Sequence, residues 1–596
     1  MRDVALVGKA YARLATATDG IYLILLTFII GGLIERIGYV CLRFKGAVAS
    51  NRSSSTEQPQ QVDDHGGAEK PSPQHRLPSS IPHVCTQLPM FNEGACAVRA
   101  IDAACMLTWP RDRYEVQVLD DSTDPAIRAA VDACASQWHA RGVNCYVLRR
   151  ERRTGYKAGA LEAGRRHTSA KFLAMFDADF VPSADFLQRT MPRFFDADGQ
   201  LIKKLALVQA QWAHLNMTES LLTLAQSLWI DDHHVSQMNW RSVTWRFVNF
   251  TGTAGVWRAE AIEVAGGWRA NSLVEDCELS FRALFCGYET AYAAVDVPSE
   301  LVGTIAAYKA QQRRWTLGWA QLIRLHLGTL LLRYKCPCVT RAHLLYHMLL
   351  SIQWPLWLAW QVLTPFLASF PLNLTTPHGA VARVAVYAGP LALHMVLASA
   401  IAAFERLHVA ERRQQVLACS GPASRALLWL LLFLRAVPSA LLSAGMLPHQ
   451  ACAWFEGILS HTAEFETTPK SGAVGVVAGA PPHPGGSSGS STSPLPRAKA
   501  RTQRCYVLME VAFVLYQAGW IAHFSYEGRY NLALSTGIPA LAVGGLWAST
   551  CLSACSRATG GVRDTCCVPR RHAAAVQLPN GHDGLLGHNI NVQHPA

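Results

Sequence analysis

Short apolar segments alternate with amphipathic ones between residues 81 and 335. Apolar and β-branched residues typical of strands fill 83–89, 115–119, 144–148, 171–176 and 206–211, and apolar positions with helical spacing fill 93–107, 125–140 and 155–167. Strands that alternate with helices in this order predict an α/β domain with a mainly parallel sheet. In such a sheet, ligands bind beyond the carboxyl ends of the strands.

Longer apolar runs lie outside this domain. Residues 342–370, 380–404, 505–525 and 530–553 are each long enough to cross ~30 Å of hydrocarbon. A cleaved signal peptide is the alternative for the run Gly20–Ile34, but no small-residue cleavage site follows it, and Arg36 and Arg43 lie on its C-terminal side. We therefore expect a membrane span there, and an α-helical multi-pass membrane domain in all.

The run 424–447 is ambiguous because Arg435 lies at its middle. At a bilayer centre the arginine costs roughly 2.5–3.5 kcal/mol and each Leu or Phe returns roughly 0.3–0.6, so hydropathy does not decide whether the run crosses. Basic residues crowd 405–425, 470–504 and the tail after 556. All three segments face the cytosol with the globular domain only if 424–447 lies in the interface, which predicts five spans; six is the alternative.

Polar segments divide the chain further. Residues 48–80 and 471–500 are rich in Pro, Gly and Ser and offer no apolar face, which is typical of disordered linkers. We expect an N-terminal region with a transmembrane helix (1–45), a linker (46–80), the globular domain (81–335), spans with the interfacial helix (336–470), an insert (471–502), a transmembrane hairpin (503–555) and a cytosolic tail (556–596).

Composition agrees with a membrane protein. Only 16% of residues are charged, against about 25% in soluble domains, and 50% are hydrophobic. The formal net charge is +12. Neither zinc-finger spacing nor a basic heptad pattern accompanies this excess, so we expect membrane lipid and no nucleic acid as a partner. The cysteines lack the spacing of a zinc site.

Acidic pairs follow two of the expected strands. In "FDADF", alternation along the strand 171–176 places Asp177 and Asp179 on one face, where hard oxygen ligands suit Mg²⁺ or Mn²⁺ bridging a diphosphate; a solvated turn is the alternative. In "VQVLDDSTD", Asp120 and Asp121 can hold a nucleoside, and the alternative is a helix start capped at Asp124.

Two further segments place charge near glycine or at a helix start. Lys157, in the basic run 149–164, is a point charge suited to phosphate, and a solvated cationic helix start is the alternative. In "NSLVEDCELSFRA", Glu275 and Asp276 precede a helix, where a carboxylate can act as general base on an acceptor hydroxyl; an acidic first turn is the alternative. Gly252 and Gly255 predict a tight wall lined by backbone between these segments.

"AYKAQQRRWTLGWAQ" bunches amide, basic and indole side chains beside an apolar run. On a helix, Gln311, Trp315 and Trp319 share one face, and Gly318 makes room there. Indole rings can stack on sugars and Arg314 can meet a departing diphosphate. An interfacial tryptophan belt is the alternative.

The order of these motifs resembles the processive, inverting glycosyltransferases of family 2, and within them the plant cellulose-synthase-like families A and C. The stretches that carry the resemblance are "QLPMFNE", "VQVLDDSTD", "RTGYKAGAL", "FDADF", "VQAQW", "GTAGVWR", "VED" and "QQRRW". The resemblance implies a GT-A (Rossmann-like) domain and assigns a role to each motif. In it Asp120 and Asp121 contact the nucleotide, Asp177 and Asp179 hold it through metal, Asp276 is the base, and Gln311, Arg314 and Trp315 bind diphosphate and chain end.

The resemblance extends to "EFETTPK", which is similar to the gating loop of processive synthases, with Phe465, Thr468 and Lys470 in place. The chain departs from the plant pattern where Thr251 replaces Asn, Arg313 replaces His, Gln211 replaces Arg and Cys277-Glu278 replaces Met-Asp. These departures bear on donor and acceptor preference.

Family A implies a Golgi mannan or glucomannan synthase that uses GDP-mannose and extends a polysaccharide acceptor. Family C, a β-1,4-glucan synthase using UDP-glucose, is the alternative. A transporter or scaffold would account for the spans but not for acidic positions ordered around a nucleotide fold.

Overall fold

A computed structural model gives the fold and describes residues 2–44, 75–369, 393–405, 430, 433–460 and 497–558. Several predicted features therefore lie outside the described residues. They are the gating loop with Phe465, Thr468 and Lys470, the start of the run 380–404, the insert 471–496 and the end of the tail.

The globular domain is built on one mixed sheet with the strand order β3-β2-β1-β4-β6-β5-β7. Its strands are β1 (Val84–Met90), β2 (Tyr114–Asp120), β3 (Asn144–Leu148), β4 (Phe172–Met175), β5 (Leu205–His214), β6 (Gly255–Arg258) and β7 (Glu289–Ser299). Every pair is parallel except those of β6, which runs antiparallel to β4 and β5. The sheet is thus mainly parallel, as expected, and the five predicted strands are β1 to β5.

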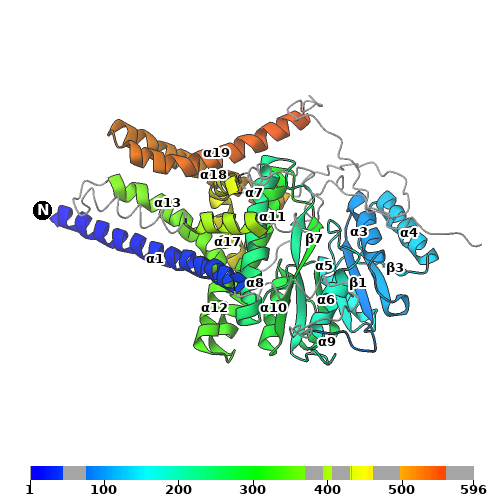
Figure 1. The fold of residues 1–596 in the computed structure, drawn as a ribbon. Coiled ribbons are helices and arrows are strands. Elements are labelled where there is room, and N and C mark those ends of the chain that lie inside the picture. The colour runs from blue at the N-terminus through cyan, green and yellow to red at the C-terminus, as the bar shows by residue number, and fades with distance from the viewer. Residues whose placement is uncertain are drawn as a thin grey trace, which may run out of the picture. The chain divides into compact units, whose positions relative to one another are not determined.

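Helices cover both faces of this sheet (Figure 1). They are α3 (Ala95–Cys105), α4 (Pro125–Ala140), α5 (Tyr156–Arg166), α6 (Phe186–Thr190), α9 (Ala259–Val264) and α10 (Glu275–Phe285), with short 3₁₀ turns at Arg111–Arg113 and Met191–Phe194. Side chains alternate between the two faces: Val84 and Leu88 join the core with α3, α4 and α6, whereas Cys85 joins the core with α5, α9 and α10. Burial on both faces explains why the strands read as nearly continuous apolar runs.

Between β5 and β6 the chain forms one bent helical run of α7 (Leu221–Asp231), a π-helical turn η3 (Asp232–Gln237) and α8 (Met238–Trp245). The remaining helices are α1 (Arg2–Phe44), α11 (Ile305–Leu332), α12 (Cys338–Leu349), α13 (Gln353–Ser369), Leu393–Glu405, α16 (Ala436–Gly445), α17 (Leu447–Leu459), α18 (Arg497–Tyr526) and α19 (Tyr530–Ala558). The long helix α1 packs along α13 and reaches η3 and α8, and α11 packs along α17 (Figure 1).

Two helices of the described chain are long and apolar enough to cross a membrane, Lys9–Phe44 and Arg504–Tyr526. The run 342–370, which we expect to span the membrane, is not one continuous α-helix, and the span stays a prediction. Its helix breaks at the 3₁₀ turn Leu350–Ile352, and α12 buries Leu344 and Met348 in a core shared with α10 and α11. The apolar residues of α12 therefore serve packing against the domain.

Arg435, which made the run 424–447 ambiguous, is fully buried. Its Nη1 lies 2.8 Å from Asp231 Oδ2 and donates to Ser227 Oγ at 2.9 Å. Both partners belong to α7. Because the charge is neutralised within the protein, this ion pair favours placing α16 against the globular domain, and five spans remain our proposal.

Candidate active site

The Asp-x-Asp sequence lies at the carboxyl edge of the sheet. β4 ends at Met175, and Ala178 and Asp179 form a turn, so strand alternation does not align the two carboxylates, contrary to expectation. The backbone N–H of Asp177 donates to Thr253 Oγ1 at 2.9 Å, and Lys157 Nζ donates to Asp177 Oδ1 at 2.5 Å. Asp177 and Asp179 are both half-buried and remain reachable from outside.

The chemistry of this pair fits a divalent ion completed by a substrate. Mg²⁺ and similar ions are commonly held by one or two carboxylates together with phosphate oxygens and water. Within the described part of the chain, no cluster of three or more His, Cys, Asp or Glu could hold an ion without such help. Asp177 and Asp179 would hold the ion, and Lys157 neutralises Asp177 when no ion does.

The second acidic pair, at the end of β2, is held by two arginines. Asp120 is buried, accepts from the N–H of Ser122 at 2.9 Å and lies 2.7 Å from Arg149 Nη2. Asp121 is half-buried and is paired with Arg150. Asp121 is therefore the more accessible carboxylate. Asp124, the alternative helix cap, does cap α4, accepting from Ala126 N at 2.8 Å and Ile127 N at 3.3 Å.

Asp276 lies in the first turn of α10 and faces Lys157 across a glycine. A Cβ added to Gly252 would lie 2.8 Å from Asp276 Oδ2 and 3.3 Å from Lys157 Nζ. Gly252 has φ +83°, and its carbonyl accepts from Lys157 Nζ at 2.9 Å. The backbone therefore comes close to the carboxylate, as the predicted wall requires. The other oxygen of Asp276, Oδ1, accepts from the N–H of Cys277 at 2.8 Å.

The environment of the Glu275–Asp276 pair favours proton binding. Burial raises the pKa of Glu275 to about 7, and the charge of Asp276 adds to the rise while Lys157 and Arg314 oppose it. Burial likewise raises the pKa of Asp276, against Lys157, backbone N–H groups and Arg314. A carboxylate whose pKa lies nearer neutrality is a better proton acceptor, which suits a general base.

The helix α11 presents two distinct faces. Gln311, Trp315 and Trp319 line a cavity of about 640 Å³, as their spacing predicted. The opposite side is anchored: Lys309 Nζ lies 2.8 Å from Glu510 Oε2, and Arg313 Nε donates to Glu456 Oε2 at 3.1 Å.

Gly318 allows α11 to approach the start of α10, because a Cβ there would lie 2.6 Å from Val274 Cγ1. Arg314 does not line the cavity, and its charge acts on Glu275 and Asp276. Residues predicted on α11 and Asp276 of α10 thus line the same cavity.

The cavity connects the globular domain with the helices around it. Thr251, Asp276 and Cys277 line it together with residues from α1, α13, α16 and α17. Three tryptophans in its wall were not singled out from the sequence, Trp229, Trp354 and Trp357, whereas Trp212 ends the motif "VQAQW". Trp354 and Trp357 are three positions apart in a run that reads as lipid-facing, so their spacing is the only signal that could have found them.

These features define a GT-A-like glycosyltransferase domain. The sheet is mainly parallel, acidic pairs follow β2 and β4, and the carboxylate of Asp276 lines a cavity with indole rings. Two family models match the chain, Glycosyl transferase family 2 over residues 87–218 and Glycosyl transferase family group 2 over residues 172–400. Residues 87–400 therefore match models of glycosyltransferase family 2.

Within that family the chain is similar to plant enzymes. It is 42% identical over 272 residues to Glucomannan 4-beta-mannosyltransferase 9 of Arabidopsis thaliana, covering 45% of this chain and 50% of that protein. It is 41% identical over 269 residues to Glucomannan 4-beta-mannosyltransferase 1 of Cyamopsis tetragonoloba, covering 44% and 50%. The chain therefore aligns with about half the length of the curated relatives it matches.

Among solved structures, a mannosyltransferase from Pyrobaculum calidifontis in complex with GDP-Man and Mn²⁺ is similar at 18% identity with a TM-score of 0.42, covering 64% of this chain and 98% of that chain.

Proposed function

We propose that the chain is a processive, inverting glycosyltransferase that extends a β-1,4-linked mannan or glucomannan from GDP-mannose, with GDP-glucose as a second donor. Sequence similarity to named glucomannan 4-beta-mannosyltransferases supports the donor and the product. The single observation that carries the processive part is one cavity lined by Asp276, by several tryptophans and by residues of α1 and α13. A polymer end needs such a cavity.

The proposed chemistry places the acceptor hydroxyl next to Asp276. The carboxylate takes the hydroxyl proton while the oxygen bonds to the anomeric carbon, and the bond from that carbon to the diphosphate breaks on the opposite face. An alcohol is a weak nucleophile near neutral pH, so a base within hydrogen-bond reach is needed. Trp315 and Trp319 offer indole faces on which the acceptor sugar can stack.

The donor would lie along the carboxyl edge of the sheet. Asp121 would contact the nucleoside, with Asp120 fixing the turn through Arg149 and Ser122. Asp177 and Asp179 would hold Mg²⁺ or Mn²⁺, which when bound offsets the diphosphate charge. Lys157, which bonds Asp177 and the Gly252 carbonyl, would release Asp177 and bond the leaving diphosphate instead. Arg314, whose charge acts on Asp276, would assist it.

We further propose a Golgi membrane protein with a cytosolic catalytic domain. Basic residues flank the apolar runs on the side of this domain. Asn216 and Asn249 lie in Asn-x-Thr sequons of this domain, and a glycan on either would contradict the cytosolic orientation. Protease protection of sealed vesicles tests the orientation: the domain should be digested from outside, and full protection would contradict it.

The activity is tested by incubating membranes that contain the chain with GDP-mannose, GDP-glucose or UDP-glucose in separate reactions. We expect polymer from GDP-mannose that an endo-β-1,4-mannanase degrades. Polymer from UDP-glucose that only an endo-β-1,4-glucanase degrades would replace this proposal with the glucan synthase. A transporter or scaffold would give no polymer from any donor and would tolerate replacement of Asp276.

A further inference from the structure

The π-helical turn η3 forms part of the cavity wall. Trp229 at the end of α7 and His233, His234 and Gln237 of η3 all line the cavity. A π-helical turn inserts one residue into a helix and redirects the side chains that follow; such turns occur frequently at functional sites. Here the redirected side chains are an imidazole and a carboxamide beside an indole, which are groups that bind sugar hydroxyls and sugar rings.

The buried indole nitrogen of Trp229 in this wall has no hydrogen-bond partner among the described residues. His233 Nδ1 is 3.2 Å from Gln237 Oε1, and the half-buried His233 lines the cavity beside Trp229. Buried polar groups are normally paired, so unpaired ones that line a cavity indicate a polar ligand or water there.

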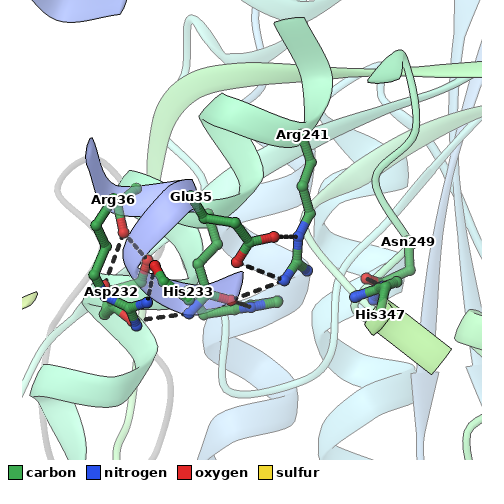
Figure 2. A network of polar contacts seen from close by, with 10 residues as sticks. Glu35, Arg36, Asp232, His233, Arg241, Asn249 and His347 are labelled. Atoms are coloured by element: carbon green, nitrogen blue, oxygen red, sulfur yellow. Dashed lines mark hydrogen bonds and ion pairs between the residues drawn. The ribbon is translucent and has the colours of Figure 1, made fainter. Parts of the chain in front are cut away.

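Trp229 and the cavity-lining residues of η3 are uncharged, so they do not select for an ionic ligand. Burial, with the nearby Arg241 charge, lowers the pKa of His233 to about 4, so its imidazole is neutral near pH 7. The one carboxylate of η3, Asp232, is neutralised by Arg36 (Figure 2). A neutral, hydrogen-bonding ligand such as a sugar therefore fits better than a phosphate or a cation.

The helix α1 holds this wall in place through two buried ion pairs. Figure 2 shows Arg36 meeting Asp232 and Glu35 meeting Arg241. Arg241 Nε donates to Glu35 Oε1 at 2.6 Å, and Arg241 Nη2 donates to Gln237 Oε1 at 3.2 Å.

All four charged side chains are at most 3% exposed. Breaking a buried ion pair by removing one partner is strongly unfavourable, so these pairs fix α1 at one position along η3 and α8.

We propose that Trp229 and His233 form a sugar-binding subsite on the side of the cavity lined by α1, and that Arg36 and Glu35 are positioning residues for it. This subsite rests on the proposed function, because it holds a unit of the growing polymer behind the unit that reacts at Asp276. Trp229 would stack on or donate to that unit, and His233 Nε2 would bond a hydroxyl. The N-terminal helix is then part of the acceptor site as well as an anchor.

Elongation of β-1,4-linked manno-oligosaccharides of increasing length tests the subsite. Trp229→Phe removes the indole donor and keeps an aromatic ring, and His233→Phe removes the ring nitrogens. Trp245→Phe is the matched control, because Trp245 in α8 also has an unpaired indole N–H but does not line the cavity.

We expect both subsite variants to raise the KM for long acceptors several-fold to about tenfold, the equivalent of one lost hydrogen bond. The KM for the shortest acceptors and for GDP-mannose should stay unchanged, and the control should match the wild type throughout. Equal effects at every acceptor length, or none, would overturn the subsite. Failure of the wild type to elongate any acceptor would instead overturn the proposed function.

Arg36→Lys tests the positioning role, because it keeps the charge but loses the planar fork that reaches Asp232 and the Gly32 carbonyl. We expect the same selective rise in KM for long acceptors, with kcat and the KM for GDP-mannose unchanged. A purely structural role would reduce folded protein and lower activity equally at all acceptor lengths, and that result would refute positioning by α1.

Discussion

Replacing Gly252 by Ala should separate activity from stability at the candidate active site. The added Cβ would lie 2.8 Å from Asp276 Oδ2, whereas ordinary contacts of a Cβ begin near 3.4 Å. The carboxylate must therefore move by about 0.6 Å, the difference of these two distances. A side-chain end moves at little cost in folding free energy, but a base displaced from its acceptor is costly, since a shift of about 1 Å can reduce a rate about 10²-fold.

Gly252 has a φ of +83°, so an alanine there also costs folding free energy through backbone strain. This loss of stability has to be distinguished from the effect on Asp276. An L-residue in this region costs about 1–2 kcal/mol. Gly142 is the matched control, because its φ is +78° and a Cβ there would meet nothing within 4 Å. Gly142→Ala should therefore lose the same folding free energy without touching Asp276.

The assay compares both variants in detergent or membranes, measuring thermal unfolding and the initial rate of sugar transfer at saturating donor. We expect similar losses of stability, and a rate reduced about 10- to 100-fold in Gly252→Ala only. Equal rates in the two variants would refute the reasoning, because Asp276 would then not need its observed position for transfer.

Three further outcomes follow from the site and its supports. Because the pKa values of Glu275 and Asp276 are raised, the folded state retains protons that the unfolded chain releases. As pH increases from about 4.5 to about 7, the rate of transfer should therefore rise and the melting temperature should fall. Excess chelator should abolish transfer and Mn²⁺ or Mg²⁺ should restore it; full activity in chelator would remove the metal role from Asp177. Arg313→Met leaves Glu456 without its ion pair and should lower stability by about 1–2 kcal/mol, whereas Arg313→Met combined with Glu456→Gln should recover part of the loss in a melting experiment.

The sequence predicted the sheet and the acidic edge because strand ends are local features. The runs that became β1 to β5 are long and strongly apolar, so the positions of Asp121 and Asp177 at the carboxyl edge followed from them. β6 is only Gly255–Arg258 and pairs with strands distant in the chain, which gives no local signal for its antiparallel direction.

Long-range pairing decided what the sequence could not show. Asp120 and Asp121 looked equivalent, yet Arg149 and the Ser122 N–H hold a buried Asp120, whereas Arg150 holds Asp121, which stays more accessible. Similarly, the sequence suggested only that Arg36 is a charge flanking an apolar run. In the structure Arg36 pairs with Asp232, which lies 196 residues further along the chain. Hydropathy also cannot distinguish apolar residues that face lipid from those of α12 that pack on α10 and α11.

Asp276→Asn, studied with donor binding and transfer measured side by side, tests the central claim most directly. Asn keeps the size and much of the hydrogen bonding of Asp276 but cannot take the acceptor proton. The account predicts that GDP-mannose affinity stays near the wild-type value while transfer falls about 10²–10⁴-fold. A variant that loses donor affinity yet keeps its maximal rate would show that Asp276 binds the donor, and would contradict its assignment as the base.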